Sequence, residues 1–182
     1  MLAVEMCFAV VWGLFWLYWL VAAFSMKRGH VPWARELGIR VVILIIALIL
    51  LRFRVLSGHA LNTDPWRAGA GLALLAVGMS CAVWARVQIG RNWGTPMTQK
   101  VDPELVTMGP YHWVRHPIYS GVLVASIGTA VALSWFWLVA VGLAAVYFLY
   151  GAMVEERYLT QRFPEAYPRY KRSTKMLVPF II

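Results

Sequence analysis

Long uncharged stretches dominate the pattern of hydrophobic and polar positions along the chain. The longest, residues 117–154, runs for 38 positions without Asp, Glu, Lys or Arg. As one helix it would be about 57 Å long at about 1.5 Å per residue, whereas the hydrocarbon core of a bilayer is about 30 Å thick. The stretch therefore predicts two membrane-spanning helices joined as a hairpin, with the turn near Leu133, Ser134 and Trp135.

Three further apolar runs precede the hairpin. Residues 6–24 are long enough to span a membrane and follow no positive segment, so we expect an uncleaved first helix rather than a signal peptide. Residues 37–56 form a second span if Arg40 and Arg52 extend their side chains toward the headgroups. Residues 68–85 form an uncharged third span.

The whole pattern predicts an all-α fold, a multi-span transmembrane helical bundle of about five helices. We expect one domain over residues 1–182, with three spans in residues 1–88 and a polar loop, the hairpin and the tail in residues 89–182. Small residues favour close helix packing in membranes. Gly69, Gly71 and Gly78 are expected to offer such a surface on the third span, and Gly121 with Ala125 is expected to do so between the two arms of the hairpin.

Composition agrees with a membrane protein. The chain is 61% hydrophobic and 14% charged, whereas a soluble domain is about one quarter charged. The net charge of +9 comes from basic residues in loops beside apolar runs, which favours membrane lipids over nucleic acid as the partner. No feature of the sequence indicates an obligate protein partner.

The distribution of lysine and arginine predicts the orientation of the bundle. With five spans, 14 basic residues fall on one side of the membrane and 3 on the other. Because the more basic side is cytoplasmic, we expect a multi-pass protein with its N-terminus outside and its C-terminus inside. The polar ends of the hairpin then face the cytosol.

Polar residues flank both ends of the hairpin. Arg115 and His116 precede it, and Glu155 and Glu156 follow it. A hairpin returns its ends to one membrane face, so these four side chains are expected to meet. A carboxylate pair there needs cationic or hydroxyl partners, supplied by Arg115 or by a ligand. A salt bridge that only fixes the hairpin, without any ligand, is the alternative.

A metal site is not expected. His112 and His116 are four residues apart, but Pro117 limits the helix that would place them on one face. Cys7 and Cys81 lie within apolar runs and have no Cys or His at ligand spacing.

Four segments resemble the isoprenylcysteine carboxyl methyltransferase family and the wider phospholipid methyltransferase group around it. They are LVTMGPY (105–111), RHPIYSG (115–121), EERYL (155–159) and FPEAYPRY (163–170). The resemblance covers about residues 99–180. It implies an integral membrane methyltransferase that holds S-adenosylmethionine in a pocket at the cytosolic face and takes its lipophilic substrate from the bilayer.

The resemblance also implies which residues form the site. Cofactor contacts carried over by motif are Gln99, Leu105, Val106, Tyr111, His116, Pro117, Tyr119 and Glu155. A carboxylate suits the ammonium or ribose hydroxyls of this cofactor, and aromatic faces suit its sulfonium. The candidate catalytic residues are His116, Arg115 and Glu156, since an amine acceptor must lose a proton to a base.

One position departs from the family pattern. Carboxyl methyltransferases of the family carry an arginine one helical turn before the glutamate pair, where this chain has Gly151. An isoprenylcysteine-like carboxylate or a related lipophilic group is the expected acceptor, and a phospholipid amine is the alternative. Two hypotheses from other classes are a nicotinamide-dependent membrane reductase with a similar hairpin and a non-catalytic membrane scaffold.

Overall fold

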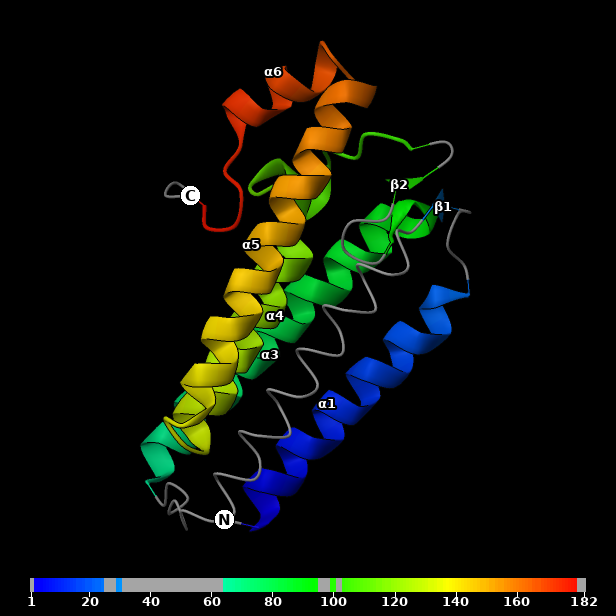
Figure 1. Ribbon diagram of the computed structural model, residues 1–182. Helices are drawn as coiled ribbons and strands as arrows, with labels where there is room; N and C mark the ends of the chain where they lie inside the picture. The colour runs from blue at the N-terminus through cyan, green and yellow to red at the C-terminus, as the bar shows by residue number, and fades with distance from the viewer. Residues whose placement is uncertain (1, 25–28, 31–63, 95–98, 101–102, 180–182) are drawn as a thin grey trace.

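The computed structural model is described for residues 2–24, 29–30, 64–94, 99–100 and 103–179, and most of these residues are helical (Figure 1). The expected second span, residues 37–56, lies outside these residues. The helices are α1 (Leu2–Ala23), α3 (Pro65–Ile89), α4 (Pro117–Ala132), α5 (Trp137–Arg162) and α6 (Ala166–Ser173), with the short 3-10 helices η1 (Gly90–Asn92) and η2 (Gly109–His112).

Two very short strands join the loops that follow α1 and η1. Strand β1 (Gly29–His30) pairs antiparallel with β2 (Gln99–Lys100), with Gly29 opposite Lys100. This backbone pairing lies at the same end of the bundle as α6 (Figure 1).

Within the described residues, three helices are long and apolar enough to cross a membrane: Ala3–Ala23, Pro65–Asn92 and Trp137–Arg162. Helix α4 is apolar but has only 16 residues, or about 24 Å at about 1.5 Å per residue. Large hydrophobic side chains stay exposed on α1 and α5, among them Leu14, Leu20 and Val146. Such a surface is suited to contact with lipid rather than with water. The helices and their apolar surfaces confirm the predicted fold class, an all-α, multi-span bundle.

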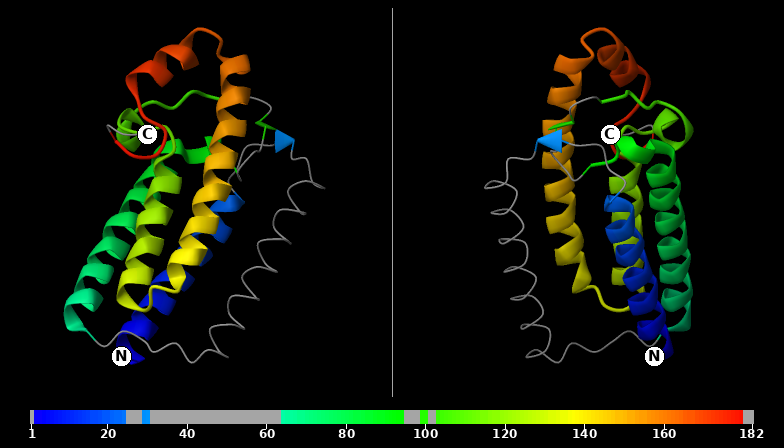
Figure 2. Two further views of the ribbon diagram at one scale, coloured as in Figure 1. Left: turned by 60° about the vertical axis from the view of Figure 1, so that its left-hand side comes forward. Right: turned by 90° about the vertical axis from the view of Figure 1, so that its right-hand side faces the viewer.

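The predicted hairpin is present in residues 117–162. Helix α4 ends at Ala132 and α5 begins at Trp137. The amide of Trp137 donates to the carbonyl of Ser134 at 3.0 Å, and the Ser134 hydroxyl accepts from the amide of Phe136 at 3.3 Å. The turn therefore lies where the change from small residues to aromatic residues predicted it. Helices α3, α4 and α5 lie side by side in both views of Figure 2.

Small residues join α3 to α4 rather than α4 to α5. A Cβ built on Gly71 would come within 2.5 Å of the carbonyl oxygen of Gly128. A Cβ built on Gly78 would lie 2.9 Å from the Cβ of Ala125 and would overlap the backbone at Gly121. The predicted partner of Gly121 and Ala125 was therefore wrong, because their small surface is used against α3.

Helix α1 packs against this pair through aromatic side chains. Phe8 and Phe15 are buried in a cluster with Leu75, Met79 and residues of α4. The indole nitrogen of Trp12 donates to the hydroxyl of Thr129 at 3.0 Å, so a polar contact also joins α1 to α4.

A buried arginine joins the ends of α1 and α3 near the site. Arg86 donates from Nη2 to the carbonyl of Ala22 at 2.7 Å and from Nη1 to the carbonyl of Gly90 at 2.8 Å. Its guanidinium also lies 4.6 Å from the centre of the Trp93 ring. Cations stabilise helix C-termini, where carbonyl groups have no helical partner.

The C-terminal tail folds back onto the start of α4. Lys175 forms a parallel bridge with Val114. The amides of Arg115 and His116 donate to the carbonyls of Lys175 and Met176 at 2.8 and 3.0 Å. The tail thus fixes the backbone that carries the histidine.

Alanine substitution at two glycines of α3 tests the tight α3–α4 contact. We expect Gly78→Ala to lower the free energy of unfolding by about 1–3 kcal/mol, since overpacking forces the backbones apart. We expect Gly69→Ala to leave it unchanged or raise it, because the site is open and alanine favours helix. Thermal unfolding in detergent, followed by tryptophan fluorescence, measures both. Equal effects would contradict the packing described.

Candidate functional site

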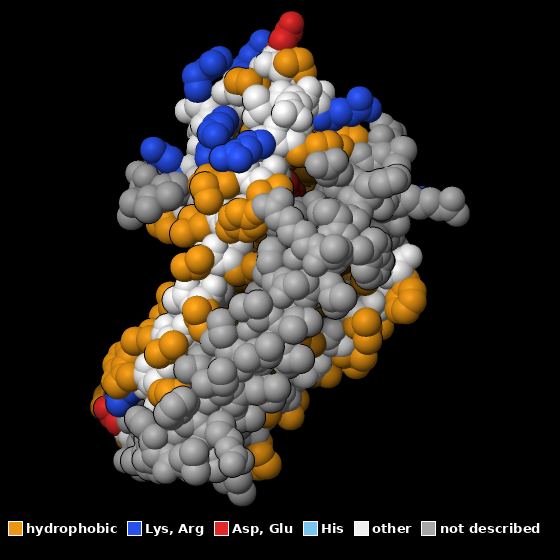
Figure 3. Space-filling model, in the orientation of Figure 1, with side chains coloured by type: hydrophobic (Ala, Val, Ile, Leu, Met, Phe, Trp, Pro, Cys, Tyr) orange, Lys and Arg blue, Asp and Glu red, His pale blue; other side chains and the backbone are white. Residues whose placement is uncertain are grey.

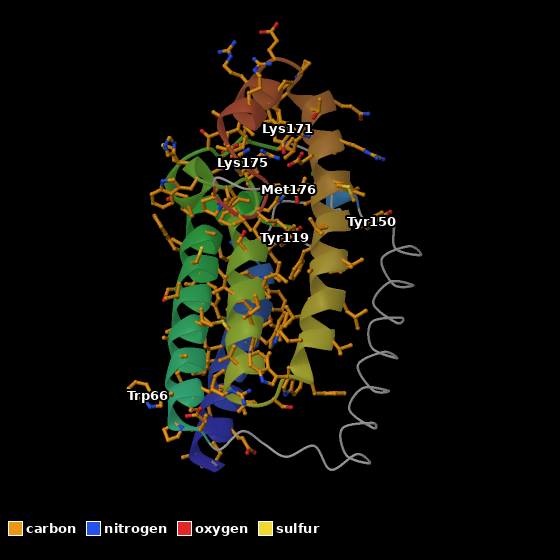
Figure 4. All side chains as sticks on the ribbon, turned by 90° about the vertical axis from the view of Figure 1, so that its left-hand side faces the viewer. Trp66, Tyr119, Tyr150, Lys171, Lys175 and Met176 are labelled. Atoms are coloured by element: carbon orange, nitrogen blue, oxygen red, sulfur yellow. The ribbon has the colours of Figure 1, made fainter. Side chains whose placement is uncertain are left out.

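The polar residues of the hairpin gather at the end of the bundle where α3, α4, α5 and α6 meet. Figure 4 shows Lys171, Lys175 and Met176 close to the end of α4 that carries Tyr119, with Trp66 at the opposite end of the bundle. On the face seen in Figure 3, lysine and arginine side chains gather over the same end, and hydrophobic side chains line the flanks. The site is therefore polar and lies at the end of an apolar bundle.

His116 is held rigidly at the start of α4. It is the residue before Pro117, which occupies the first helical position, where a missing N–H costs nothing. Its ring stacks on that of Tyr119 at 5.3 Å and an interplanar angle of 2°, and Tyr119 stacks on Phe148 of α5 at 4.7 Å and 8°. This column of three rings sets the plane of the imidazole.

The imidazole lies between the two glutamates of α5. Its Nδ1 is 3.8 Å from Glu155 Oε2, and its Nε2 is 3.6 Å from Glu156 Oε1. Both distances exceed those of a hydrogen bond. The hairpin thus brings His116, Glu155 and Glu156 together at one end of the bundle.

Glu156 is the centre of a buried ionic network. Its Oε1 accepts from Arg115 Nε at 2.6 Å and its Oε2 from Lys171 Nζ at 2.7 Å. The Glu156 and Arg115 side chains are 4% and 7% exposed. Arg115 Nη1 also donates to the carbonyls of Lys171 and Thr174. Two proposed catalytic residues are therefore bonded to each other and to the tail.

Glu155 has a different environment. Its side chain is 35% exposed, and its Oε2 accepts from the Tyr119 hydroxyl at 3.4 Å. Arg115 and Lys171 form ion pairs with Glu156 and not with Glu155. Glu155 is therefore the carboxylate of the pair that remains accessible to a ligand.

A hollow opens beside His116 and Glu155, with an empty volume of about 610 Å³ that includes open solvent at its mouth. The residues implied by the resemblance that line it are Leu105, Val106, Tyr111, Arg115, His116 and Glu155. Its other lining residues are Ile89, Asn92, Pro103, Glu104, Tyr158, Leu159, Tyr167 and Tyr170.

Three of the proposed residues whose side chains are described do not line this hollow. Pro117 and Tyr119 lie behind His116, where they position its ring. Glu156 is held by Arg115 and Lys171. Gln99 belongs to strand β2, and its side chain lies outside the described residues.

Sequence reasoning assigned no site role to the Asn92–Glu104 pair. Asn92 Nδ2 donates to Glu104 Oε2 at 3.1 Å, and the Glu104 amide donates to Asn92 Oδ1 at 3.3 Å. This reciprocal pair fixes the loop that precedes η2 against η1, at the end of α3. The two residues are twelve positions apart, so local sequence patterns do not indicate their contact.

Tyrosines from two elements complete the wall. The Tyr170 hydroxyl of α6 donates to the carbonyl of Tyr111 at 2.5 Å. Burial raises the pKa of Tyr111 well above its ordinary value, and the nearby Glu155 carboxylate raises it further. Burial likewise raises the pKa of Tyr167, with Glu156 and Glu155 adding to the effect. Both phenols therefore stay neutral at physiological pH.

Two polar atoms at the hollow lack partners. His116 Nε2 and the Tyr167 hydroxyl are buried and make no hydrogen bond within the described part of the chain. Buried polar groups are normally satisfied by protein, water or ligand. With the Glu155 carboxylate and the apolar side chains of Leu105 and Val106, they form a set that fits a ligand with both polar and apolar parts.

Comparison with known proteins identifies similar chains. The family model described as phospholipid methyltransferase matches residues 66–166. The chain is 33% identical over 147 residues to the nickel-cobalt-cadmium resistance protein NccN of Alcaligenes xylosoxydans xylosoxydans, covering 79% of this chain and 64% of the relative. It is 35% identical over 125 residues to protein-S-isoprenylcysteine O-methyltransferase of Xenopus laevis, covering 66% and 43%.

Two further likenesses extend the comparison. Methanethiol S-methyltransferase of a Pseudomonas species is 29% identical over 146 residues, covering 75% of this chain and 56% of the relative. A solved eukaryotic intramembrane Ras methyltransferase, isoprenylcysteine carboxyl methyltransferase, has a similar fold, with a TM-score of 0.58 and 23% identity over 84% of this chain and 55% of that one. The chain thus spans 43% to 64% of the length of these three curated relatives.

The two adjacent glutamates provide a matched test of the ionic network. We expect Glu156→Gln to lower the free energy of unfolding by about 3 kcal/mol, because it leaves the buried Arg115 guanidinium without its counter-ion. Glu155→Gln is expected to change stability little, since that carboxylate is partly exposed and has no lysine or arginine partner among the described residues. Thermal unfolding of both variants measures the difference. Similar losses would contradict the assignment of Glu156 as the structural carboxylate.

Proposed function

We propose that this chain, which belongs to the phospholipid methyltransferase family and is similar to isoprenylcysteine carboxyl methyltransferases, is an integral membrane methyltransferase. In this proposal it binds S-adenosylmethionine in the hollow beside His116 and Glu155 and methylates a lipophilic acceptor. The observation that carries the proposal is the placement of an imidazole between two carboxylates beside a hollow lined by residues of four of the family-like segments and loops.

The lining residues suit the parts of this cofactor. Glu155 can accept hydrogen bonds from an ammonium group or from ribose hydroxyls. Leu105 and Val106 offer an apolar wall, and the ring of Tyr111 offers an aromatic face that attracts a cation. The His116 side chain also belongs to the lining, where its imidazole can contact a polar group of the ligand.

S-adenosylmethionine, when bound, supplies a methyl group on a positively charged sulfur. The protein then has to position the acceptor and exclude water, which are the main sources of acceleration for a displacement of this kind. The stacked rings of His116, Tyr119 and Phe148 hold one wall in place. The carbonyls of Lys171 and Thr174 accept from Arg115 and so hold another lining residue in place.

The acceptor decides whether a base is needed. A carboxylate acceptor needs none, whereas an amine must lose a proton. His116 is a better base than Glu156, because both carboxylate oxygens of Glu156 are held by Arg115 and Lys171. We therefore assign Arg115 and Glu156 to positioning, and reserve proton transfer, where the acceptor requires it, for His116.

Position 151 bears on the class of acceptor. Gly151 is buried on α5, one helical turn before Glu155. Arg115 cannot replace a missing arginine there, since its donors reach Glu156 and the tail, and Arg157 is exposed. An isoprenylcysteine-like carboxylate, a phospholipid amine and a lipophilic thiol all fit the remaining apolar surroundings, and all three would reach the site from the bilayer.

The exposed basic side chains support one orientation of the protein in the membrane. Arg157, Arg162, Arg169, Arg172 and Lys175 are exposed at the end that holds the site. Because basic residues favour the cytoplasmic side, this end faces the cytosol, where the methyl donor would be available.

Binding of S-adenosylhomocysteine, the demethylated product, tests the cofactor directly. We expect calorimetry on the purified, folded protein to detect binding, and Glu155→Gln and His116→Ala each to weaken it about tenfold or more, as loss of a charge-assisted bond predicts. Glu165→Gln is the matched control, because Glu165 is exposed and does not line the hollow.

Other outcomes of this experiment identify the competing functions. Absence of binding at millimolar ligand by folded protein would overturn the proposed activity. Protection against unfolding by NADPH instead of S-adenosylhomocysteine would indicate the reductase. Variants that lose stability, in a protein that binds neither ligand, would indicate the scaffold.

Methyl transfer to lipid tests the acceptor. Incubation of the protein in vesicles with radiolabelled S-adenosylmethionine and separate prenylcysteine, phosphatidylethanolamine or alkyl thiol acceptors is expected to place label in the organic phase. Glu155→Gln is expected to abolish the labelling, and Glu165→Gln to preserve it. Label confined to water-soluble acceptors would contradict a lipophilic substrate.

A further inference from the structure

Tyr167 differs from the other tyrosines of the site because its buried hydroxyl has no partner. The side chain comes from the first turn of α6, is 1% exposed and lines the hollow. Its oxygen makes no hydrogen bond to any described residue. An unsatisfied buried hydroxyl costs about 1–3 kcal/mol, so such groups point to a missing partner.

A neighbouring tyrosine shows the contrast. Tyr170 lies one helical turn further along α6 and lines the same hollow, but its hydroxyl donates to the carbonyl of Tyr111 at 2.5 Å. The two side chains therefore share a residue type, a helix and a cavity. They differ in that the Tyr170 hydroxyl forms a hydrogen bond within the protein and the Tyr167 hydroxyl forms none with the described residues.

A second residue that lines the same hollow also carries a buried atom without a hydrogen bond. The Nε2 atom of His116 is buried, lies 3.6 Å from Glu156 Oε1 and makes no hydrogen bond in the described part of the chain. His116 begins α4, whereas Tyr167 belongs to α6. Unsatisfied atoms from two separate elements at one cavity indicate that a ligand, rather than side-chain packing, completes the polar contacts.

The charges around Tyr167 limit what it can bind. Its phenol stays neutral, because burial raises its pKa and the carboxylates of Glu156 and Glu155 raise it further. Arg115 and Lys171 compensate Glu156, but Glu155 has neither as a partner. A ligand carboxylate beside Tyr167 would be repelled by Glu155. A ligand hydroxyl can accept from Tyr167 and donate to Glu155.

We propose that Tyr167 is a binding residue for the methyl donor and that its hydroxyl donates to a ribose hydroxyl, which in turn donates to Glu155. This assignment rests on the proposed function, since it concerns the same cofactor. It gives α6 a direct role in binding, so that the helix after the hairpin supplies one wall of the site and one of its polar contacts.

Two phenylalanine variants and two ligands test the proposal. Calorimetry measures S-adenosylhomocysteine and its 2′,3′-dideoxy analogue on wild type, Tyr167→Phe and Tyr170→Phe, and unfolding temperatures are measured without ligand. We expect Tyr167→Phe to bind S-adenosylhomocysteine about three- to tenfold more weakly, as loss of one neutral hydrogen bond predicts. The penalty is expected to vanish for the dideoxy analogue, as in a double-mutant cycle.

Stability separates a binding role from a structural one. Without ligand, Tyr167→Phe is expected to unfold at the same or a higher temperature, since it removes an unsatisfied hydroxyl and keeps the buried ring. Tyr170→Phe is expected to unfold at a lower temperature, because the carbonyl of Tyr111 loses its donor. A lower unfolding temperature for Tyr167→Phe would show that its hydroxyl has a partner within the protein, and would overturn the proposal.

The binding outcomes distinguish this proposal from the proposed function. Failure of the wild type to bind S-adenosylhomocysteine overturns both. Binding by the wild type with an equal affinity for Tyr167→Phe overturns the role of Tyr167 alone. A penalty that persists with the dideoxy analogue overturns the assignment to a ribose hydroxyl.

Discussion

The buried ion pair between Arg115 and Glu156 is the interaction on which the arrangement of the site depends. Burying two charges is expensive, so the pair is stable only with close geometry and further hydrogen bonds. The structure supplies both, through Lys171 and the carbonyls of α6 and the tail. Three distant segments of the chain are thereby fixed to one point, and His116 lies next to that point.

Helix length explains why the two arms of the hairpin meet at the same height. His116 lies 16 residues before Ala132, and Glu155 lies 18 residues after Trp137. At about 1.5 Å per residue these separations correspond to about 24 and 27 Å. Helix α5 then continues past the site to Arg162, which places α6 where it can turn back over the hollow. The contact of α4 with α3, made by small residues, holds the shorter arm in place.

The division of labour between the two glutamates follows from their environments. Glu156 accepts from donors on two other segments and serves the fold, whereas Glu155 is partly exposed and lines the hollow. The helix places them 100° apart around its axis, given about 3.6 residues per turn. Adjacent residues of the same type therefore face different surroundings and serve different purposes.

Much of this arrangement could be predicted from the sequence, because apolar length and charge position are properties of the chain itself. The hairpin, its turn at Ser134 and the meeting of His116 with Glu155 follow from residue counts. The partner of Gly121 could not be predicted, since a small surface on α4 does not specify which neighbour it contacts. The Asn92–Glu104 pair and the return of the tail depend on loop paths, which periodicity does not encode.

The sequence motifs indicated which residues lie near the hollow, but they did not distinguish residues that bind a ligand from residues that stabilise the fold. The segment containing Tyr167 and Tyr170 resembles the family as a unit, and only the hydrogen bonds distinguish the two hydroxyls. Likewise Arg115 was proposed as catalytic from its position beside His116, and the distances assign it to the network around Glu156. Such roles depend on where a side chain finds a partner.

An experimental structure in a lipid nanodisc with S-adenosylhomocysteine bound tests the central claim most directly. The account predicts ligand density in the hollow between α4, α5 and α6, in contact with His116 and Glu155, with Arg115 still paired to Glu156. Ligand density at another place, or His116 and Glu155 at opposite membrane faces, would contradict it.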